Sequence, residues 1–181
     1  MALENVAELS QVLAKRERLG QVFARHAYGM RAWVDLFSAR VASITDPELK
    51  TLVATLVADN ARHMLLFRQR ARADGVDPDA YVAPDEGEAI YRRIDELDDF
   101  DELLGYALGS LDHFDELLAV YRAAADREDA EAIDSVRADV ARMRASLRPL
   151  AGATAERLAA EAHERYRLRE LVETPRYIHG G

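Results

Sequence analysis

The sequence predicts an all-helical protein, and three observations lead to this fold class. Alanine, leucine, arginine and glutamate, which are strong helix formers, dominate the 181 residues. Only 5 prolines interrupt them. Apolar residues recur at steps of three and four, whereas runs of alternating β-branched residues, which would indicate strands, are absent. The length and the 49% hydrophobic content suffice for one sizeable core, so residues 1–181 are expected to form a single domain.

The first half predicts a helical segment followed by an antiparallel pair of helices. The segment covers about residues 3–18 and pauses at Gly20. The next helix carries one apolar seam, made of Phe23, Ala27, Met30, Val34, Phe37, Val41 and Ile44. Thr45 or Asp46 is expected to cap the following helix, with Pro47 in its first turn. That helix runs to about residue 73 and ends at Gly75; its inner side holds Leu49, Leu52, Leu56, His63, Phe67 and Arg70.

The second half predicts a crossover, a second helix pair and a final helix. Residues 75–98 form the crossover, which holds one short helix near 87–97. The acidic residues Asp98, Asp99, Asp101 and Glu102 suit the positive N-terminus of a third long helix, which turns near residue 127. A fourth helix covers about 129–148, and an alanine-rich helix at about 153–172 ends before Pro175. Residues 173–181 are left as a tail.

Composition restricts the classes of function. The formal charge of -9 argues against nucleic acid as a partner, because phosphate binding needs a basic surface. The absence of cysteine excludes disulfides and thiolate metal sites. No apolar run reaches membrane-spanning length, and the N-terminus carries no basic and apolar leader. A cytoplasmic protein with no membrane association is therefore expected.

The segment Ala58-Asp59-Asn60-Ala61-Arg62-His63 resembles the Asp-Glu-x-x-His stretch of the ferritin-like di-iron carboxylate proteins. The long crossover between the second and third helices is also similar to that family's connectivity. The resemblance covers about residues 20–148. It implies a four-helix bundle of two antiparallel hairpins joined by this crossover, with the C-terminal helix added to it.

The same resemblance implies a metal site with altered ligands. Asn60 stands where the family has a metal-binding glutamate, and His63 matches the family histidine. Residues equidistant from the first turn should pair, which places His26 near the position of the family's first-helix glutamate. His113 lies roughly at the third-helix glutamate position. On the fourth helix, Asp139 flanks the apolar seam, and Arg142, three residues further on, points away from it.

These residue types favour a single ion over a dinuclear centre. Two irons need bridging carboxylates, whereas an imidazole has one lone pair and an amide is a weak ligand. We therefore expect either no metal or one transition-metal ion (Fe or Zn) held by His26, Asn60, His63 and His113. Asp59 and Asp139 are outer candidates. The alternative is that the histidines are hydrogen-bonded core residues. Asp59, Asp112 and Asp115 are expected on solvated helix faces, and a dinuclear centre that uses these carboxylates as ligands is the remaining option.

Two functions of different classes follow from these readings. The first is a non-catalytic, structural or partner-binding member of the ferritin-like group. The second is a metal-dependent oxidoreductase or hydroxylase of that group, with a histidine-rich mononuclear or atypical two-metal site. A haem-oxygenase-like helical fold is a more remote option. A homodimer is expected in either case, and residues 173–181 are a candidate docking peptide for a protein partner.

Overall fold

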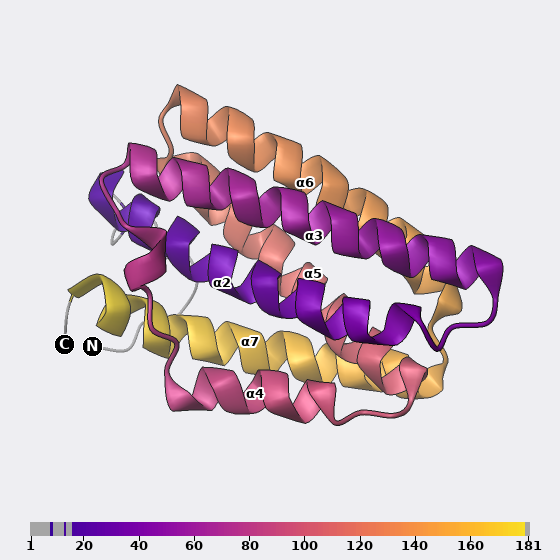
Figure 1. Ribbon diagram of the computed structural model, residues 1–181. Helices are drawn as coiled ribbons and strands as arrows, with labels where there is room; N and C mark the ends of the chain where they lie inside the picture. Colours follow the sequence, from indigo (N-terminus) through magenta and orange to yellow (C-terminus); the bar gives the residue numbers. More distant parts are fainter. Residues whose placement is uncertain (1–7, 9–12, 14–15, 180–181) are drawn as a thin grey trace. The chain divides into compact units, whose positions relative to one another are not determined.

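The computed structural model describes Glu8, Leu13 and residues 16–179, and every regular element among them is a helix. The chain divides into two compact units, which are described separately. The N-terminal unit comprises residues 20–96, and the C-terminal unit comprises residues 97–181 together with residues 1–19. The all-helical fold class is thus confirmed (Figure 1). The expectation of a single domain stays a prediction.

The N-terminal unit is built on an antiparallel pair, α2 (Arg16–Val41) and α3 (Pro47–Ala73) (Figure 1). The Asp46 carboxylate accepts a hydrogen bond from the Leu49 amide at 2.7 Å, so the predicted cap at the start of α3 is confirmed. The buried rings of Phe23 and Phe67 lie 4.8 Å apart between centroids. Both residues are 22 positions from residue 45, as expected for helices paired about that turn.

The expected pause at Gly20 is wrong, because α2 begins at Arg16 and continues through this glycine. A Cβ at position 20 would lie 2.7 Å from Asp74 Cβ and 3.0 Å from Val76 Cγ2. Gly20 therefore lets the turn after α3 approach the helix, and it does not end a helix. Gly75, in that turn, has a φ of 81°, so the predicted left-handed end of α3 is confirmed.

The crossover holds a short 3-10 helix, η2 (Pro78–Ala80), and the helix α4 (Asp85–Asp95). Arg68 donates to both carboxylate oxygens of Asp79 at 2.7 and 2.8 Å, which lowers the pKa of Asp79 and ties η2 to α3. Arg40 on α2 donates to the carbonyl oxygens of Ile94 and Asp95 at 3.0 Å each. These bonds hold the end of α4 beside α2.

The C-terminal unit contains α5 (Phe100–Ala124), α6 (Arg127–Leu147), the 3-10 turn η3 (Arg148–Leu150) and α7 (Ala153–His179) (Figure 1). The buried face of α5 is wide and mostly apolar. Its buried residues are Leu103, Leu104, Gly105, Tyr106, Ala107, Leu108, Gly109, His113, Leu117, Leu118 and Tyr121. A face this wide can contact α6 and α7 at once.

The expected end of the last helix near residue 172 is wrong, since α7 continues past Pro175 to His179. Proline removes one backbone hydrogen bond from a helix, but a helix can accommodate this loss without ending. The candidate docking tail, residues 173–181, therefore lies largely within α7. Its last two residues lie outside the described part of the chain.

The start of α7 is capped by a residue of another helix. The Asp101 carboxylate, in the first turn of α5, accepts hydrogen bonds from the amides of Gly152 at 3.0 Å and Ala155 at 3.1 Å. Replacing Asp101 with alanine is expected to lower the free energy of unfolding by about 1 to 2 kcal/mol, as for loss of an N-cap. Urea denaturation measures this. Asp98→Ala, at an exposed position before α5, should change it by less than about 0.5 kcal/mol; equal losses would contradict the capping role.

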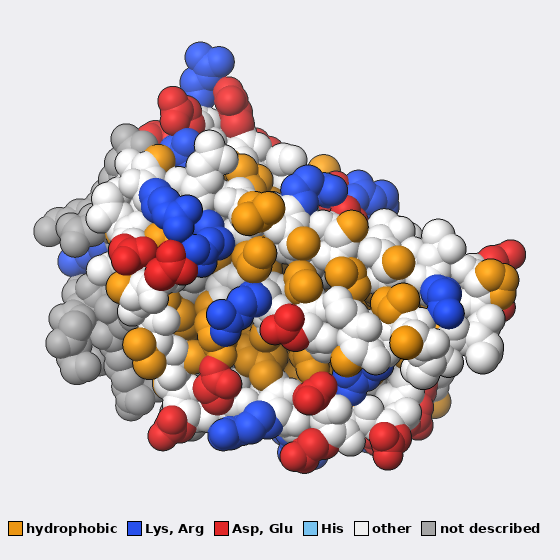
Figure 2. All heavy atoms as spheres, viewed as in Figure 1, with side chains coloured by type: hydrophobic (Ala, Val, Ile, Leu, Met, Phe, Trp, Pro, Cys, Tyr) orange, Lys and Arg blue, Asp and Glu red, His pale blue; other side chains and the backbone are white. Residues whose placement is uncertain are grey.

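The face of the molecule in Figure 2 carries both charged and hydrophobic side chains. On the face seen in Figure 2, acidic and basic side chains are interspersed, with hydrophobic side chains between them. Large apolar side chains with high exposure include Leu65, Val82 and Leu150. Among the described residues, no helix combines the length and the apolar character needed to cross a lipid bilayer.

Candidate metal centre

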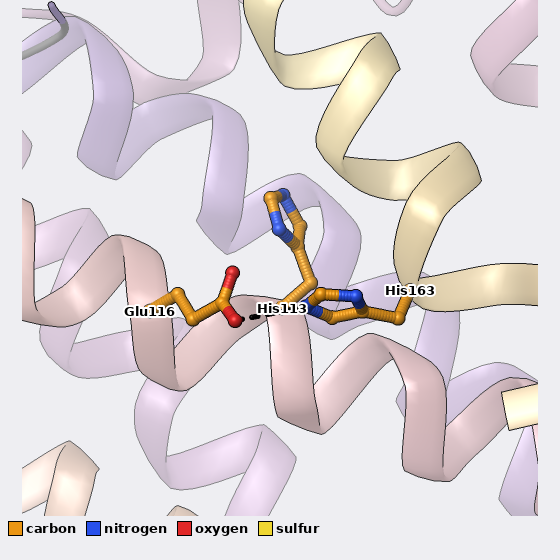
Figure 3. A group of neighbouring side chains, drawn as sticks. All are labelled: His113, Glu116 and His163. Atoms are coloured by element: carbon orange, nitrogen blue, oxygen red, sulfur yellow. Dashed lines mark ion pairs between the residues drawn. The ribbon is translucent and has the colours of Figure 1, made fainter. Parts of the chain in front are cut away.

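Two residues of α5 form one half of a candidate metal centre. His113 and Glu116 are three positions apart, so they lie on neighbouring turns of the same helix face. His113 is buried and Glu116 is exposed, which places the pair across the edge of the buried face. Figure 3 shows both side chains extending from α5. The spacing thus brings an imidazole and a carboxylate together at the surface of the unit.

The other half comes from α7, which lies very close to α5 because small residues line the crossing. A Cβ on Gly105 would lie 2.7 Å from Leu158 Cβ. A Cβ on Gly109 would collide with the Ala159 carbonyl oxygen and would lie 2.9 Å from the His163 amide nitrogen. Gly109 is one helical turn before His113. The absence of a side chain at position 109 therefore brings His163 within reach of His113 and Glu116.

The three side chains converge, and we call them the His-Glu cluster: His113, Glu116 and His163. One potential ligand atom from each lies within 4.8 Å of the others. The His163 Nε2 atom is 3.0 Å from the Glu116 Oε1 atom, and the two imidazole centroids are 6.0 Å apart (Figure 3). Two ligand atoms held about 2.1 Å from one tetrahedral ion are about 3.4 Å apart. The Glu116–His163 distance is close to this value.

The donor set is chemically suited to one ion. Two imidazoles and one carboxylate bind divalent iron and zinc in proteins, and three protein ligands leave coordination positions open for water or substrate. Glu116 and His163 are both partly exposed, with side-chain exposures of 51% and 28%. Their side chains can therefore rotate toward an ion, while the buried His113 provides a fixed ligand.

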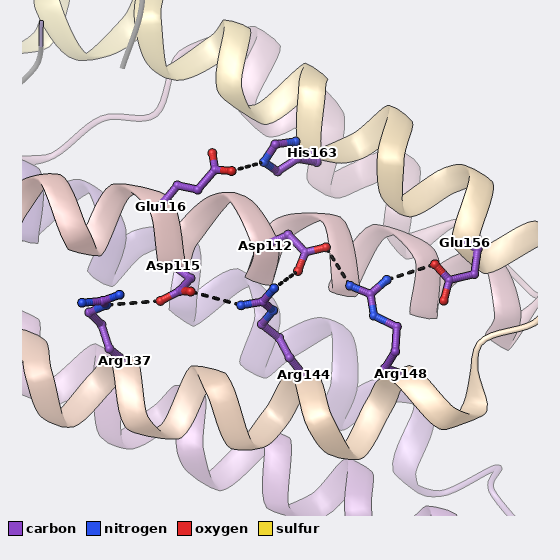
Figure 4. Close-up of polar contacts among 8 residues, drawn as sticks. All are labelled: Asp112, Asp115, Glu116, Arg137, Arg144, Arg148, Glu156 and His163. Atoms are coloured by element: carbon purple, nitrogen blue, oxygen red, sulfur yellow. Dashed lines mark hydrogen bonds and ion pairs between the residues drawn. The ribbon is translucent and has the colours of Figure 1, made fainter. Parts of the chain in front are cut away.

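A row of charged residues, the arginine–carboxylate ladder, lies next to the cluster. It alternates in sign and joins α5, α6, η3 and α7 (Figure 4). Arg144 contacts Asp112 at 2.7 Å and Asp115 at 3.1 Å. The row consists of Arg137, Asp115, Arg144, Asp112, Arg148 and Glu156, with N–O distances of 2.7 to 3.2 Å. This connected network orients the face of α5 that carries the cluster.

Glu116 and His163 of the cluster and most residues of the ladder line one open cleft of about 620 Å³, within the range of small-molecule sites. Burial opposes the charge of Arg148, but hydrogen bonds to Asp112 and Glu156 outweigh it, so the pKa of Arg148 is raised above its ordinary value. A hydrogen bond from Arg167 lowers the pKa of the Glu164 carboxyl at the cleft edge. Arg148 and Glu164 therefore stay charged at neutral pH.

Four of the residues expected at the site lie in the N-terminal unit. His26 is half-buried on α2, and His63 is buried on α3. Asn60 is half-buried and donates to the Leu56 carbonyl oxygen at 2.8 Å. Asp59 is buried and contacts Arg62 at 2.9 Å, so the solvated face expected for Asp59 is wrong. A site that unites His26, Asn60 and His63 with His113 stays a prediction.

The remaining candidates lie in the C-terminal unit. His113, the expected third-helix ligand, belongs to the His-Glu cluster. Asp139 is half-buried and pairs with the exposed Arg142 at 2.5 Å, and the outward direction expected for Arg142 fits its exposure. Asp112 and Asp115 are half-buried within the ladder rather than on a solvated face, because arginines of α6 and η3 cover them.

Sequence reasoning missed Glu116, His163 and the arginines of the ladder. The sequence does contain a signal for the position of His163: two helices carry small residues at the same spacing. Gly105 and Gly109 are four positions apart, and so are Ala155 and Ala159. Such spacing is typical of helices that cross closely. It would have placed the final helix against the third long helix, with His163 opposite His113-x-x-Glu116.

Comparison of the chain with family models, with curated proteins and with solved structures gives no match.

Proposed function

We propose that this protein binds one divalent transition-metal ion through His113, Glu116 and His163. The observation that carries the proposal is the convergence of three potential ligand atoms within 4.8 Å, from two helices held together by a glycine-lined crossing. Imidazole and carboxylate together favour Fe²⁺ or Zn²⁺ over Mg²⁺ or Ca²⁺, which prefer oxygen ligands alone. The metal-binding reading of the sequence is thereby preferred to the purely structural one.

The adjoining cleft supports a chemical role for the ion. Glu116 and His163 line it, so coordination positions left open by the protein would face a space that admits a small molecule. An ion with three protein ligands can act as a Lewis acid or, as iron, can bind oxygen. A metal-dependent oxidoreductase or hydroxylase is therefore the catalytic form of this proposal. The chain's own contribution is to hold the three ligands and orient them.

Metal binding by untagged protein tests the proposal. We expect wild type to bind one Co²⁺ or Zn²⁺ per chain in equilibrium dialysis, with a Co²⁺ absorption spectrum of mixed nitrogen and oxygen ligands. His163→Ala should weaken binding by at least about 100-fold, because a direct ligand matters at least as much as the groups that orient it. Circular dichroism on both proteins verifies that the helices are retained.

His26→Ala is the matched control, since it removes a half-buried histidine of the N-terminal unit. It should leave the affinity unchanged. If His26→Ala abolishes binding and His163→Ala does not, the set expected from the ferritin-like resemblance is the better description. Absence of binding by wild type would overturn the proposal and would favour the non-catalytic, structural or partner-binding function.

The ferritin-like arrangement is also a proposal. It is supported by two antiparallel hairpins, α2–α3 and α5–α6, and by the crossover of more than 20 residues between them. The cluster uses α7, which lies outside the four helices of that family's site, so metal binding here does not depend on this arrangement. A cytoplasmic homodimer, with a partner recognised through residues 173–181, completes the proposal; light scattering measures the mass of the assembly.

A further inference from the structure

The closest approach of α5 and α7 is lined mainly by small residues. Gly105 and Gly109 of α5 face Ala155, Leu158, Ala159 and Ala162 of α7. Glycine and alanine allow close approach of two helices, although each removes little apolar surface from water. Polar contacts along this crossing therefore add to the packing that holds α7 on α5.

The described polar contacts are distributed unevenly along α7. Its beginning is tied twice: Asp101 accepts from the amides of Gly152 and Ala155, and Glu156 pairs with Arg148 at 3.0 Å. Further along α7, His163 pairs with Glu116 of α5 at 3.0 Å, and its ring centroid lies 6.0 Å from that of His113. That pair is half-exposed, and an ion pair in such a position contributes little to stability. A metal ion bound at this point would add a second link between the same two helices.

We propose that the ion bound at the His-Glu cluster acts as a clamp that controls the docking of α7 on α5. This inference rests on the proposed metal binding. His113 and Glu116 belong to α5, whereas His163 belongs to α7, so the full ligand set exists only when α7 is docked. An ion that binds the docked state more tightly than the undocked state must shift the equilibrium toward docking. Release of the ion then loosens α7.

The loosened state has a defined consequence for the surface. Undocking of α7 around residues 159–163 would expose Gly109, which Ala159 and Ala162 now cover. It would also open the cleft, of which Ala159, Ala160 and His163 form one wall. A low concentration of the metal ion would thus increase the exposure of an apolar face of α5. This is a conformational response in addition to any chemistry at the ion.

Hydrogen exchange of the full chain, read by mass spectrometry with and without Zn²⁺, tests the clamp. At free Zn²⁺ about 100 times the dissociation constant, amides of residues 157–167 should exchange up to about 100-fold more slowly, since the docked state gains a factor of 1 + [L]/Kd. Amides of α6 should change much less. The variant His163→Gln should lose the Zn²⁺-dependent slowing.

The matched control is Glu161→Gln, which disrupts the exposed pair with Arg157 on the outer side of α7. It should keep the full slowing. Dialysis on the same samples separates the two proposals. The clamp is overturned, and the metal site stands, if Zn²⁺ binds but the exchange rate of residues 157–167 does not change. The same conclusion holds if hydrogen exchange slows equally in α5, α6 and α7. If Zn²⁺ does not bind, both proposals are overturned.

Discussion

Gly109→Ala is expected to weaken metal binding more than any other substitution that adds a single methyl group. The new Cβ would collide with the Ala159 carbonyl oxygen and would lie 2.8 Å from Ala162 Cβ, so α5 and α7 must separate locally. Backbone atoms cannot rotate away as a flexible side chain can. Overpacking of this kind costs about 1 to 3 kcal/mol of stability. The separation also moves His163 away from His113 and Glu116, and we expect the Zn²⁺ affinity to fall at least about 10-fold.

Gly105→Ala is the control for Gly109→Ala, because it adds the same group to the same crossing one turn further from the cluster. Its Cβ would lie 2.7 Å from Leu158 Cβ and 2.9 Å from the Ala155 carbonyl oxygen. Chemical denaturation should therefore show a comparable loss of stability. Dialysis should show a smaller loss of Zn²⁺ affinity than for Gly109→Ala. Equal losses of affinity would mean that the crossing supports the fold without positioning His163.

Phe67→Ala is expected to give the largest loss of stability in the N-terminal unit, about 3 to 5 kcal/mol. The Phe67 ring is fully buried on α3 and packs against the Phe23 ring of α2 at 4.8 Å. Its removal leaves a cavity that rigid helices fill only in part. Urea denaturation, followed by circular dichroism at 222 nm, measures the free energy of unfolding.

The control for Phe67→Ala is Leu65→Ala, two positions earlier on the same helix. Leu65 is 62% exposed, so its truncation should change the free energy of unfolding by less than about 0.5 kcal/mol. If both variants lost stability equally, Leu65 would be buried in solution, for example against a second copy of the chain. That result would show a contact of Leu65 that a single chain does not make, and would support the expected dimer.

The sequence predicted the helices well because helix signals are local. Each of these signals affects the backbone within about four positions. Examples are Asp46 beside Pro47, Gly75 after an apolar-periodic run, and the acidic residues before α5. The level pairing of Phe23 with Phe67 also follows from one short turn, since a short turn fixes the register of an antiparallel pair. Local chemistry therefore determined both the elements and the hairpins.

The candidate site was harder to predict because it depends on a contact between residues about 50 positions apart. His113 was identified from its place on an apolar face, whereas Glu116 and His163 were not identified, and the site with His26, Asn60 and His63 stays a prediction. His163 was missed because the C-terminal helix was treated as an addition to a four-helix core. Gly20 and Gly109 mark positions where two segments of the chain pack closely. The sequence alone does not distinguish a glycine that permits close packing from one that ends a helix.

The carboxylate that caps α7 also constrains the order of assembly. Asp101 is synthesised about 50 residues before the amides of Gly152 and Ala155, which donate to its carboxylate in the folded unit. Nucleation of an isolated helix is unfavourable, so an acceptor that is already present would help the last helix to begin. If this contact forms in the folding transition state, mutation of Asp101 should slow refolding as well as lower stability.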